Sequence, residues 1–397
     1  MGKKILIFST AYLPLIGGAE IALKEITQRL ADNFSFDLIC ARIKKELPVY
    51  EKIGEVEVYR AGRGWGKVDK FLLPWRGFKL ARKLNGQKKY DAIWAIMASF
   101  GGLAALFFKE QFPGVPYVLT LQEGDTPEHI FSRAKWLGPY YKRMFKRADY
   151  ITAISQYLKE YAIRCSATCP IEVVPNGVDL DKFQIPNSKF QINSKSQISK
   201  FKTELGIKDG EKVIITVSRL VEKNGIGDLI QAMKELSAAS CRLLILGSGP
   251  LEKNLKSEAK KLRLADKISF LGNVPNDEIP RYLAMADVFV RPSLSEGLGN
   301  SFLEAMAAGI PVIGTSVGGI PDFLSDPERN PDKPPTGLFC EVKNPPSIAE
   351  KIKLILSDEN LRQKLINNGR ELVVKNYDWN LIAQKIDGIF NQLTSGK

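Results

Sequence analysis

Two glutamates eight positions apart flank a glycine-rich segment in the last third of the chain. Glu296 precedes Gly297-Leu298-Gly299-Asn300-Ser301, and Glu304 lies in the first turn of the helical pattern that follows. A strand-like segment at 288–291 comes before them, so the region is predicted to be a strand, a glycine loop and a helix. The loop N–H groups can donate to phosphate and sugar oxygens, and the carboxylates can accept from hydroxyls. The spacing of Ser301 and Glu304 also matches a capping box, which is a structural alternative.

A second loop of this kind carries two cations. Arg219 and Lys223 follow a strand-like segment at 213–217, and Gly225 precedes the next helical pattern. A planar guanidinium and a mobile ammonium in such a loop can clamp a diphosphate between them. The alternative is an exposed loop in which Lys223 pairs with a local acid such as Glu222.

Three further glycine turns follow predicted strands: Gly17-Gly18, Gly247-Ser248-Gly249-Pro250, and Gly318-Gly319 before Asp322. Glycines at a strand-to-helix turn let a ligand approach the backbone and direct helix N–H groups at an anion. Each turn is unspecific alone, because paired glycines are common in turns. The segment at 247–250 also lacks the third glycine of a dinucleotide fingerprint.

The elements that position these loops alternate along the whole chain. Short apolar runs are followed by amphipathic stretches, which predicts an α/β fold of two doubly wound, parallel-sheet halves with a cleft between them. Ligands of such sheets bind beyond the carboxyl ends of the strands. The alternation stops in a Ser-, Asn-, Lys- and Gln-rich stretch, which predicts a linker or exposed insertion. The predicted organisation is a first domain at 1–183, a linker at 184–205, a second domain at 206–375 and a final helix at 376–397.

Composition excludes several classes of protein. The chain has 397 residues with 44% hydrophobic side chains, too many for a disordered protein. No apolar run is long enough to cross a bilayer, and the N-terminus reads as a buried strand rather than a signal peptide. The five cysteines are scattered, which argues against disulfides and zinc and favours a reducing, cytoplasmic compartment. His129 is the only histidine and no Gly-x-Ser-x-Gly elbow accompanies it, which argues against a serine hydrolase.

The net charge of +13 is concentrated in two stretches of the first half. Residues 70–89 mix seven cations with Phe71, Leu72, Leu73, Trp75 and Phe78, and residues 133–147 mix cations with aromatic side chains. Such helices can dock on an anionic membrane surface, or they can be solvated faces whose apolar sides lie in the core. No nucleic-acid motif accompanies them, so nucleic acid is not predicted as a partner.

The order of these motifs resembles glycosyltransferase family 4. The residues that carry the resemblance are Gly17-Gly18-Ala19-Glu20, Pro175-Asn176-Gly177-Val178-Asp179, Arg219-Leu220, Gly247-Ser248-Gly249-Pro250, Ala286-Asp287-Val288 and the Glu296/Glu304 pair. The resemblance covers nearly the whole chain. It implies a retaining enzyme of the GT-B fold, in which two Rossmann-like domains face a central cleft and the last helix crosses back onto the first domain.

The resemblance also implies roles for individual residues. Glu304 is expected to bind the donor ribose, Glu296 to face the transferred sugar, and Arg219 and Lys223 to neutralise the diphosphate during catalysis. The remaining expected contacts to the donor are Gly17, Gly18, Asn224, Gly249, Val274 near the nucleobase, Leu298, Gly299, Asn300 and Ser301. The expected acceptor side comprises Glu20, Asp125 and His129.

Two positions depart from the family pattern. Asn224 stands where relatives usually have lysine, so Lys223 is expected to supply the second phosphate cation. Gln122 stands where relatives often have histidine; it can donate a hydrogen bond but cannot become cationic. We count Gln122 among the expected catalytic residues and treat His129 as more often structural than chemical.

The function expected from the resemblance is retaining transfer of a hexose from a nucleoside diphosphate sugar to a glycan, lipid-linked or small-molecule acceptor. No cofactor or metal is expected, and Asp179-Leu180-Asp181 is interpreted as a chance match to a metal-binding D-x-D. A cytoplasmic location, peripheral on the inner face of the membrane, would fit. The alternatives are a nucleotide-sugar epimerase of the same fold and a catalytically silent sugar-nucleotide-binding protein.

Overall fold

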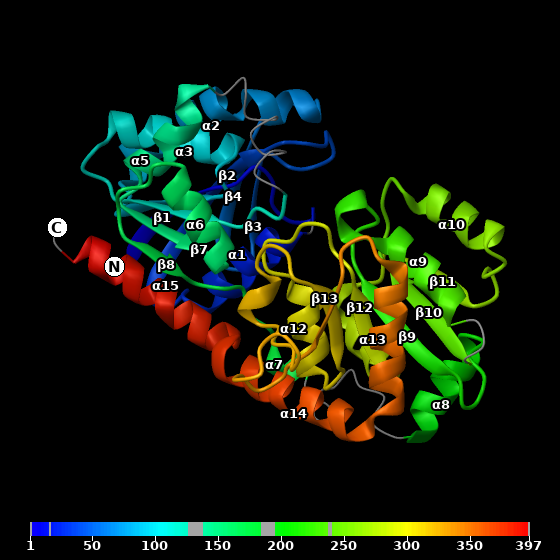
Figure 1. Cartoon of the computed structure of the whole chain (residues 1–397). Coiled ribbons are helices and arrows are strands. Elements are labelled where there is room, and N and C mark those ends of the chain that lie inside the picture. The colour runs from blue at the N-terminus through cyan, green and yellow to red at the C-terminus, as the bar shows by residue number, and fades with distance from the viewer. Residues whose placement is uncertain (1, 16, 126–137, 184–194, 237–239, 396–397) are drawn as a thin grey trace. The chain divides into compact units, whose positions relative to one another are not determined.

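The computed structural model describes residues 2–15, 17–125, 138–183, 195–236 and 240–395 (Figure 1). The chain divides into two compact units: unit 1 is Met1–Asn176 with Trp379–Lys397, and unit 2 is Gly177–Asp378. The divisions therefore fall at Asn176 and Asp378, where the sequence analysis set them at 183 and 375. No described helix is long and apolar enough to cross a membrane.

Unit 1 is built on an eight-stranded sheet in the order β3-β4-β2-β1-β5-β6-β7-β8. All neighbours are parallel except β3, which pairs antiparallel with β4. Strand β3 was not predicted from the sequence. Its Tyr-Glu-Lys-Ile segment is half-exposed at the sheet edge and therefore lacks the apolar run of a buried strand. The strands are β1 (Lys3–Phe8), β2 (Phe34–Ala41), β3 (Tyr50–Ile53), β4 (Val56–Ala61), β5 (Ala92–Ile96), β6 (Tyr117–Leu121), β7 (Tyr150–Ala153) and β8 (Ile171–Val173).

Helices cover this sheet, and the last helix of the chain is one of them. The final helix α15 packs against α1, with the Phe390 ring 5.3 Å from Trp94 and 5.4 Å from Phe34. The prediction that the last helix returns to the first domain is confirmed. The described helices of unit 1 are α1 (Gly18–Arg29), α2 (Lys67–Lys88), α3 (Phe100–Gln111), α5 (Pro139–Arg147), α6 (Gln156–Arg164) and α15 (Trp379–Thr394).

Unit 2 has a six-stranded, all-parallel sheet in the order β11-β10-β9-β12-β13-β14. Strand order reverses between β9 and β12, and in doubly wound sheets ligands bind beyond the carboxyl ends of the strands at this point. The predicted α/β fold with two parallel sheets is confirmed. The strands are β9 (Lys212–Val217), β10 (Cys241–Leu246), β11 (Ile268–Gly272), β12 (Val288–Arg291), β13 (Val312–Thr315) and β14 (Leu338–Cys340).

The second half of the predicted linker or exposed insertion at 184–205 forms a helix, α8 (Lys195–Glu204). A single aromatic residue anchors this polar helix: Phe201 is buried, 5.1 Å from the Tyr282 ring and below the Arg281 guanidinium. Residues 184–194 lie outside the described part of the chain. The other helices of unit 2 are α7 (Leu180–Phe183), η2 (Glu222–Asn224), α9 (Ile226–Glu235), α10 (Glu252–Lys261), η3 (Asn276–Glu278), α11 (Ile279–Leu283), α12 (Asn300–Ala307), η4 (Ile320–Asp322), α13 (Pro345–Ser357) and α14 (Glu359–Asn376).

Candidate active site

The loops that follow β9 and β12 are locked together by their backbones. The carbonyl oxygen of Lys223 accepts from the N–H groups of Leu294, at 2.6 Å, and Ser295, at 3.4 Å. Gly225 has a φ of +66°, and a Cβ there would lie 2.0 Å from the carbonyl oxygen of Pro292. Only glycine permits this approach. The two loops singled out in the sequence therefore form one structure at the switch point of the unit 2 sheet.

The loop after β13 joins them through the backbone of Glu296. Gly319 N–H donates to the Glu296 carbonyl oxygen at 3.1 Å. Gly318 has a φ of +55°, and a Cβ there would lie 1.8 Å from the same oxygen. The Gly318-Gly319 turn thus fixes the position of the Glu296 backbone. Gly249 has a similar structural use, since its Cα packs directly on the backbone of Leu220.

The Glu296 side chain is held from two directions. It forms an ion pair with Arg291, the last residue of β12. Its Oε1 also accepts from the N–H of Gly297 at 3.0 Å. No role for Arg291 was predicted from the sequence. A charged residue at the end of a buried strand can have several roles, so the local sequence pattern does not identify this one.

Glu304 is not part of a capping box, so that interpretation is wrong. Helix α12 begins at Asn300 after the N-cap Gly299, which makes no side-chain capping bond. Ser301 therefore lies inside the helix, where its hydroxyl accepts from Arg291 at 2.8 Å. Glu304 is the fifth residue of the helix rather than a member of its first turn. Among the described residues its carboxylate has no hydrogen-bond partner.

The environment of Glu304 makes it a carboxyl group that titrates near neutral pH. Burial raises its pKa from 4.5 to about 7, and the cations Lys182 and Arg291 oppose the rise. Lys182 is a residue that the sequence analysis missed. It lies on α7, which packs against α12, and its Nζ donates to Asp277 Oδ1 at 2.8 Å. This ion pair ties α7 to η3, directly after the half-buried Val274 of the predicted nucleobase loop.

The candidate phosphate-binding residues differ in exposure. Arg219 is exposed, and its guanidinium makes no polar contact with the residues that the structure describes. Asn224 is buried, and its Nδ2 donates to the carbonyl oxygen of Arg219 at 2.6 Å. Its amide is therefore turned into the loop rather than toward a ligand. Lys223 is half-buried on η2, next to the backbone contacts described above.

In unit 1 the candidate acceptor residues lie in the segments that follow β1 and β6. Glu20 lies in the first turn of α1, where a Cβ on Gly17 would meet its Oε2 at 2.6 Å, and burial raises its pKa. Gln122 is buried after β6, and its Oε1 accepts from Asn176 Nδ2 at 3.4 Å. Asp125 is half-buried in the same loop. His129 lies outside the described residues.

A neighbouring glutamate was missed. Glu123 follows Gln122, and its Oε1 accepts from the Ala98 N–H at 2.6 Å. That bond secures a turn after β5 in which Met97 has a φ of +67°. Burial raises the pKa of Glu123 to about 7, although hydrogen bonds from backbone N–H groups lower it. Its Oε2 has no hydrogen-bond partner in the described part of the chain. No sequence signal distinguishes this acid from an exposed loop residue.

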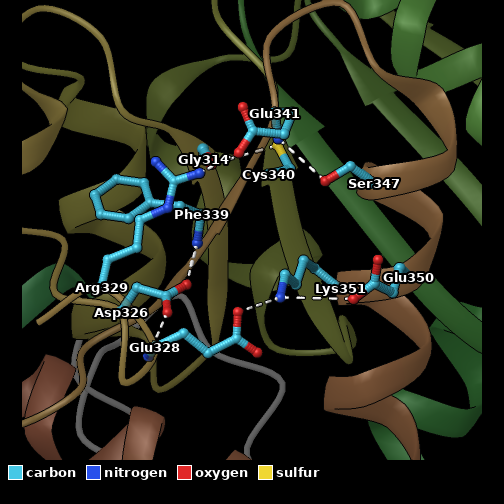
Figure 2. Close-up of polar contacts among 10 residues, drawn as sticks. All are labelled: Gly314, Asp326, Glu328, Arg329, Phe339, Cys340, Glu341, Ser347, Glu350 and Lys351. Atoms are coloured by element: carbon cyan, nitrogen blue, oxygen red, sulfur yellow. Dashed lines mark hydrogen bonds and ion pairs between the residues drawn. The ribbon is translucent and has the colours of Figure 1, made fainter. Parts of the chain in front are cut away.

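A cavity of about 580 Å³ lies elsewhere in unit 2, between the segment 321–336 and the C-terminal half of α14. None of the predicted donor residues lines it. Its wall is held by the contacts in Figure 2, where Asp326 accepts from the N–H groups of Glu328 and Phe339 at 2.8 and 2.6 Å. Lys351 supports the same segment by donating to Glu328 at 2.9 Å. The network braces the edge of the sheet next to β14.

Comparisons with known proteins cover both units. A family model described as "Glycosyltransferase Family 4" matches residues 16–182, and one described as "Glycosyl transferases group 1" matches residues 197–372. An uncharacterized glycosyltransferase of Methanocaldococcus jannaschii is 31% identical, over 98% of this chain and 97% of its own.

Two further relatives are more distant. A GDP-mannose-dependent alpha-(1-6)-phosphatidylinositol monomannoside mannosyltransferase of Mycobacterium tuberculosis is 26% identical, over 97% of each chain. Among solved structures, a sucrose-phosphate synthase from Thermosynechococcus elongatus has a TM-score of 0.84 at 20% identity, with 100% of both chains covered. At that identity the likeness speaks for the fold alone.

Proposed function

This chain belongs to glycosyltransferase family 4 and has the GT-B fold, and we therefore propose that it transfers a hexose from a nucleoside diphosphate sugar to an acceptor hydroxyl, retaining the anomeric configuration. One observation carries the proposal. The loops after β9 and β12 meet at the switch point of unit 2, so Arg219, Lys223 and Glu296 belong to one assembly. A site for a sugar nucleotide needs cationic side chains that bind the phosphates and a carboxylate that binds the sugar.

In this proposal each part of the donor has its own group of residues. Glu304 accepts hydrogen bonds from the ribose hydroxyls, for which its carboxylate is suited because it has no hydrogen-bond partner within the described part of the chain. Glu296 accepts from hydroxyls of the transferred sugar. The N–H groups near Leu298, Gly299 and Asn300 donate to the sugar and the diphosphate, at the N-terminus of α12.

The proposed reaction needs no strong protein base. The bond between the anomeric carbon and the diphosphate oxygen breaks, and its electron pair leaves with the diphosphate. The acceptor hydroxyl oxygen forms the new bond on the same face of the sugar, and its proton passes to the leaving phosphate. Arg219 and Lys223 stabilise the charge that develops on the diphosphate. The proposal assigns this task to side chains and not to a metal ion.

The acceptor is proposed to bind unit 1, through the loops that carry Glu20, Gln122 and Asp125. The mycobacterial relative is named for a lipid acceptor, a phosphatidylinositol monomannoside. That name favours a lipid-linked acceptor here over a soluble one. An enzyme with such an acceptor works at a membrane surface.

An exposed aromatic face on unit 1 supports membrane docking. We define this face as Phe71, Trp75, Phe107 and Tyr140, whose rings form a chain with centroids 6.2, 6.5 and 5.9 Å apart. Phe71, Trp75 and Tyr140 are 45%, 48% and 41% exposed. Exposed cations at Lys79, Arg82 and Lys83 continue along α2. Aromatic side chains beside cations suit an anionic membrane surface.

The structure corrects the predicted docking stretch at 70–89 in three places. Leu73 is fully buried in the core and cannot insert into a membrane. Lys88 donates to Asp37 at 2.7 Å, and Arg76 pairs with the buried Asp69 at 2.5 Å, so neither cation is available to lipids. Part of the second stretch, 133–137, lies outside the described residues.

We predict salt-sensitive binding to anionic vesicles and none to neutral ones. Replacing Lys79, Arg82 and Lys83 with glutamine should weaken vesicle binding about a hundredfold, since each cation contributes about 1 kcal/mol near such a surface. Co-sedimentation with vesicles measures this. The matched control replaces the exposed Lys253, Lys260 and Lys261 of α10 in unit 2 and should leave binding unchanged. Wild-type protein that ignores anionic vesicles at low salt would indicate a soluble acceptor.

The donor itself is tested by thermal unfolding with UDP-, GDP- and ADP-sugars. We expect one nucleotide class to stabilise the protein, by about 2.7 kcal/mol at 100 times its dissociation constant. Stabilisation by none of the three would overturn the proposal. Donor cleavage then separates the transferase from a silent binding protein, and release of an altered sugar nucleotide without any acceptor would indicate the epimerase.

A further inference from the structure

Arg291 is a buried guanidinium directly beneath the glycine loop of unit 2. Its side chain is 8% exposed and that of its partner Glu296 is 15% exposed. Nη1 donates to Ser301 Oγ at 2.8 Å, Nε donates to Ser293 Oγ at 3.2 Å, and Nη2 meets the Glu296 carboxylate. The guanidinium also lies over the Phe302 ring, 4.9 Å from its centroid. Each of its three nitrogens thus has a partner, and one face of the guanidinium is covered by the Phe302 ring.

These contacts hold the Arg291 side chain in one orientation, and the Arg291–Glu296 ion pair in turn restricts the orientation of the Glu296 carboxylate. Glu296 Oε2 faces the guanidinium, and Oε1 accepts from the Gly297 N–H at 3.0 Å. A carboxylate oxygen has about two lone-pair sites, so each oxygen keeps one for a ligand. A side chain on Gly299 would crowd the pair, because its Cβ would lie 3.2 Å from Arg291 Nη2 and 3.4 Å from Glu296 Cγ.

We propose that Arg291 is the positioning residue for Glu296, whose carboxylate it holds aimed at the hydroxyls of the donor sugar. The proposal rests on the proposed function. It also narrows the chemistry of Glu296. A carboxylate already paired with a buried guanidinium is a poor nucleophile but a good hydrogen-bond acceptor. Glu296 therefore binds uncharged sugar hydroxyls rather than forming a covalent glycosyl intermediate.

The charged surroundings of Glu296 allow a clean test. Its remaining neighbours are uncharged backbone groups of Gly297, Gly318 and Gly319. The other charged side chains of this site are Arg219 and Lys223 after β9 and Glu304 on α12. Because Arg291 also opposes the rise in the pKa of Glu304, the variants are compared at a single pH.

The experiment is a double-mutant cycle of Arg291→Met and Glu296→Gln, read by thermal unfolding and by donor affinity in calorimetry. Arg291→Met should weaken affinity roughly tenfold to a hundredfold. The double variant should be no weaker than Arg291→Met alone and should unfold at the same or a higher temperature, because no unpaired carboxylate remains. Donor affinity should show the same coupling as stability, which an arginine with a merely structural role would not produce.

Arg329→Met is the matched control. Arg329 also pairs with a glutamate and lies over a phenylalanine ring, 5.4 Å from Phe339 (Figure 2). It lines the cavity that none of the predicted donor residues lines. It should leave donor affinity unchanged. Additive effects of Arg291→Met and Glu296→Gln on donor affinity would overturn the positioning role. If the two substitutions are coupled in stability but the wild-type protein binds no sugar nucleotide, the proposed function is overturned instead.

Discussion

Replacing Glu304 with glutamine should weaken donor binding and at the same time stabilise the empty protein at alkaline pH. The carboxylate is proposed to accept both ribose hydroxyls, and losing hydrogen bonds to a charged group costs roughly tenfold to a hundredfold in affinity. The gain in stability has a separate origin. Burial raises the pKa of Glu304 to about 7 from 4.5, so ionising it in the folded protein is unfavourable.

The pH dependence of that gain follows from linkage. Between pH 4.5 and about 7 the folded protein keeps a proton that the unfolded chain has lost, so the stability cost grows through this window and is complete above it. Glutamine carries no such cost. Melting temperatures of the two proteins should therefore be similar near pH 5 and diverge by several degrees at pH 8, with the variant higher. Unchanged affinity for the donor nucleotide would reduce Glu304 to a structural residue.

Replacing Arg219 with alanine should lower turnover far more than it weakens donor binding. Negative charge on the leaving diphosphate is greatest in the transition state, so a cation that faces it acts mainly there. We expect turnover to fall about a hundredfold to a thousandfold, while the dissociation constant changes less than about tenfold. The guanidinium of Arg219 is exposed and makes no polar contact with the described residues, so the melting temperature should not change. Equal losses in turnover and affinity would mean that Arg219 only holds the bound donor.

Lys223→Ala and Asn224→Ala form the comparison that identifies the second cation. The Asn224 amide is buried and donates to the Arg219 carbonyl oxygen at 2.6 Å. Its loss should cost about 1 kcal/mol of stability and lower the melting temperature. Lys223→Ala should instead act mainly on turnover, because Lys223 is proposed to face the leaving diphosphate. Both variants are assayed at one temperature at which each remains folded. If Asn224→Ala then reduces turnover more than Lys223→Ala does, Asn224 and not Lys223 fills the place of the family lysine.

Local pattern was sufficient for the architecture. Strands that are buried on both faces must be nearly continuous apolar runs, so β9, β10 and β12 were visible in the sequence as short hydrophobic segments. The polar segments α8 and β3 escaped, because each is held by contacts that composition does not reveal. For α8 that contact is Phe201 against Tyr282, whose positions in the chain are far apart.

The same division applies to the candidate site. Residue types and spacing alone determined that Glu296, Glu304, Arg219 and Lys223 lie in loops and helix starts after parallel strands, where a sugar nucleotide can be bound. Only the tertiary structure decided which side chains face them. Ser301 had the spacing of a cap, yet it accepts from Arg291, because the helix begins at Asn300, two residues earlier than a cap at Ser301 would require. Lys182 acts on Glu304 from a helix remote in sequence, because α7 packs on α12. Periodicity reports how a segment meets the core, whereas the partner of a charged group depends on which distant segments the fold brings into contact.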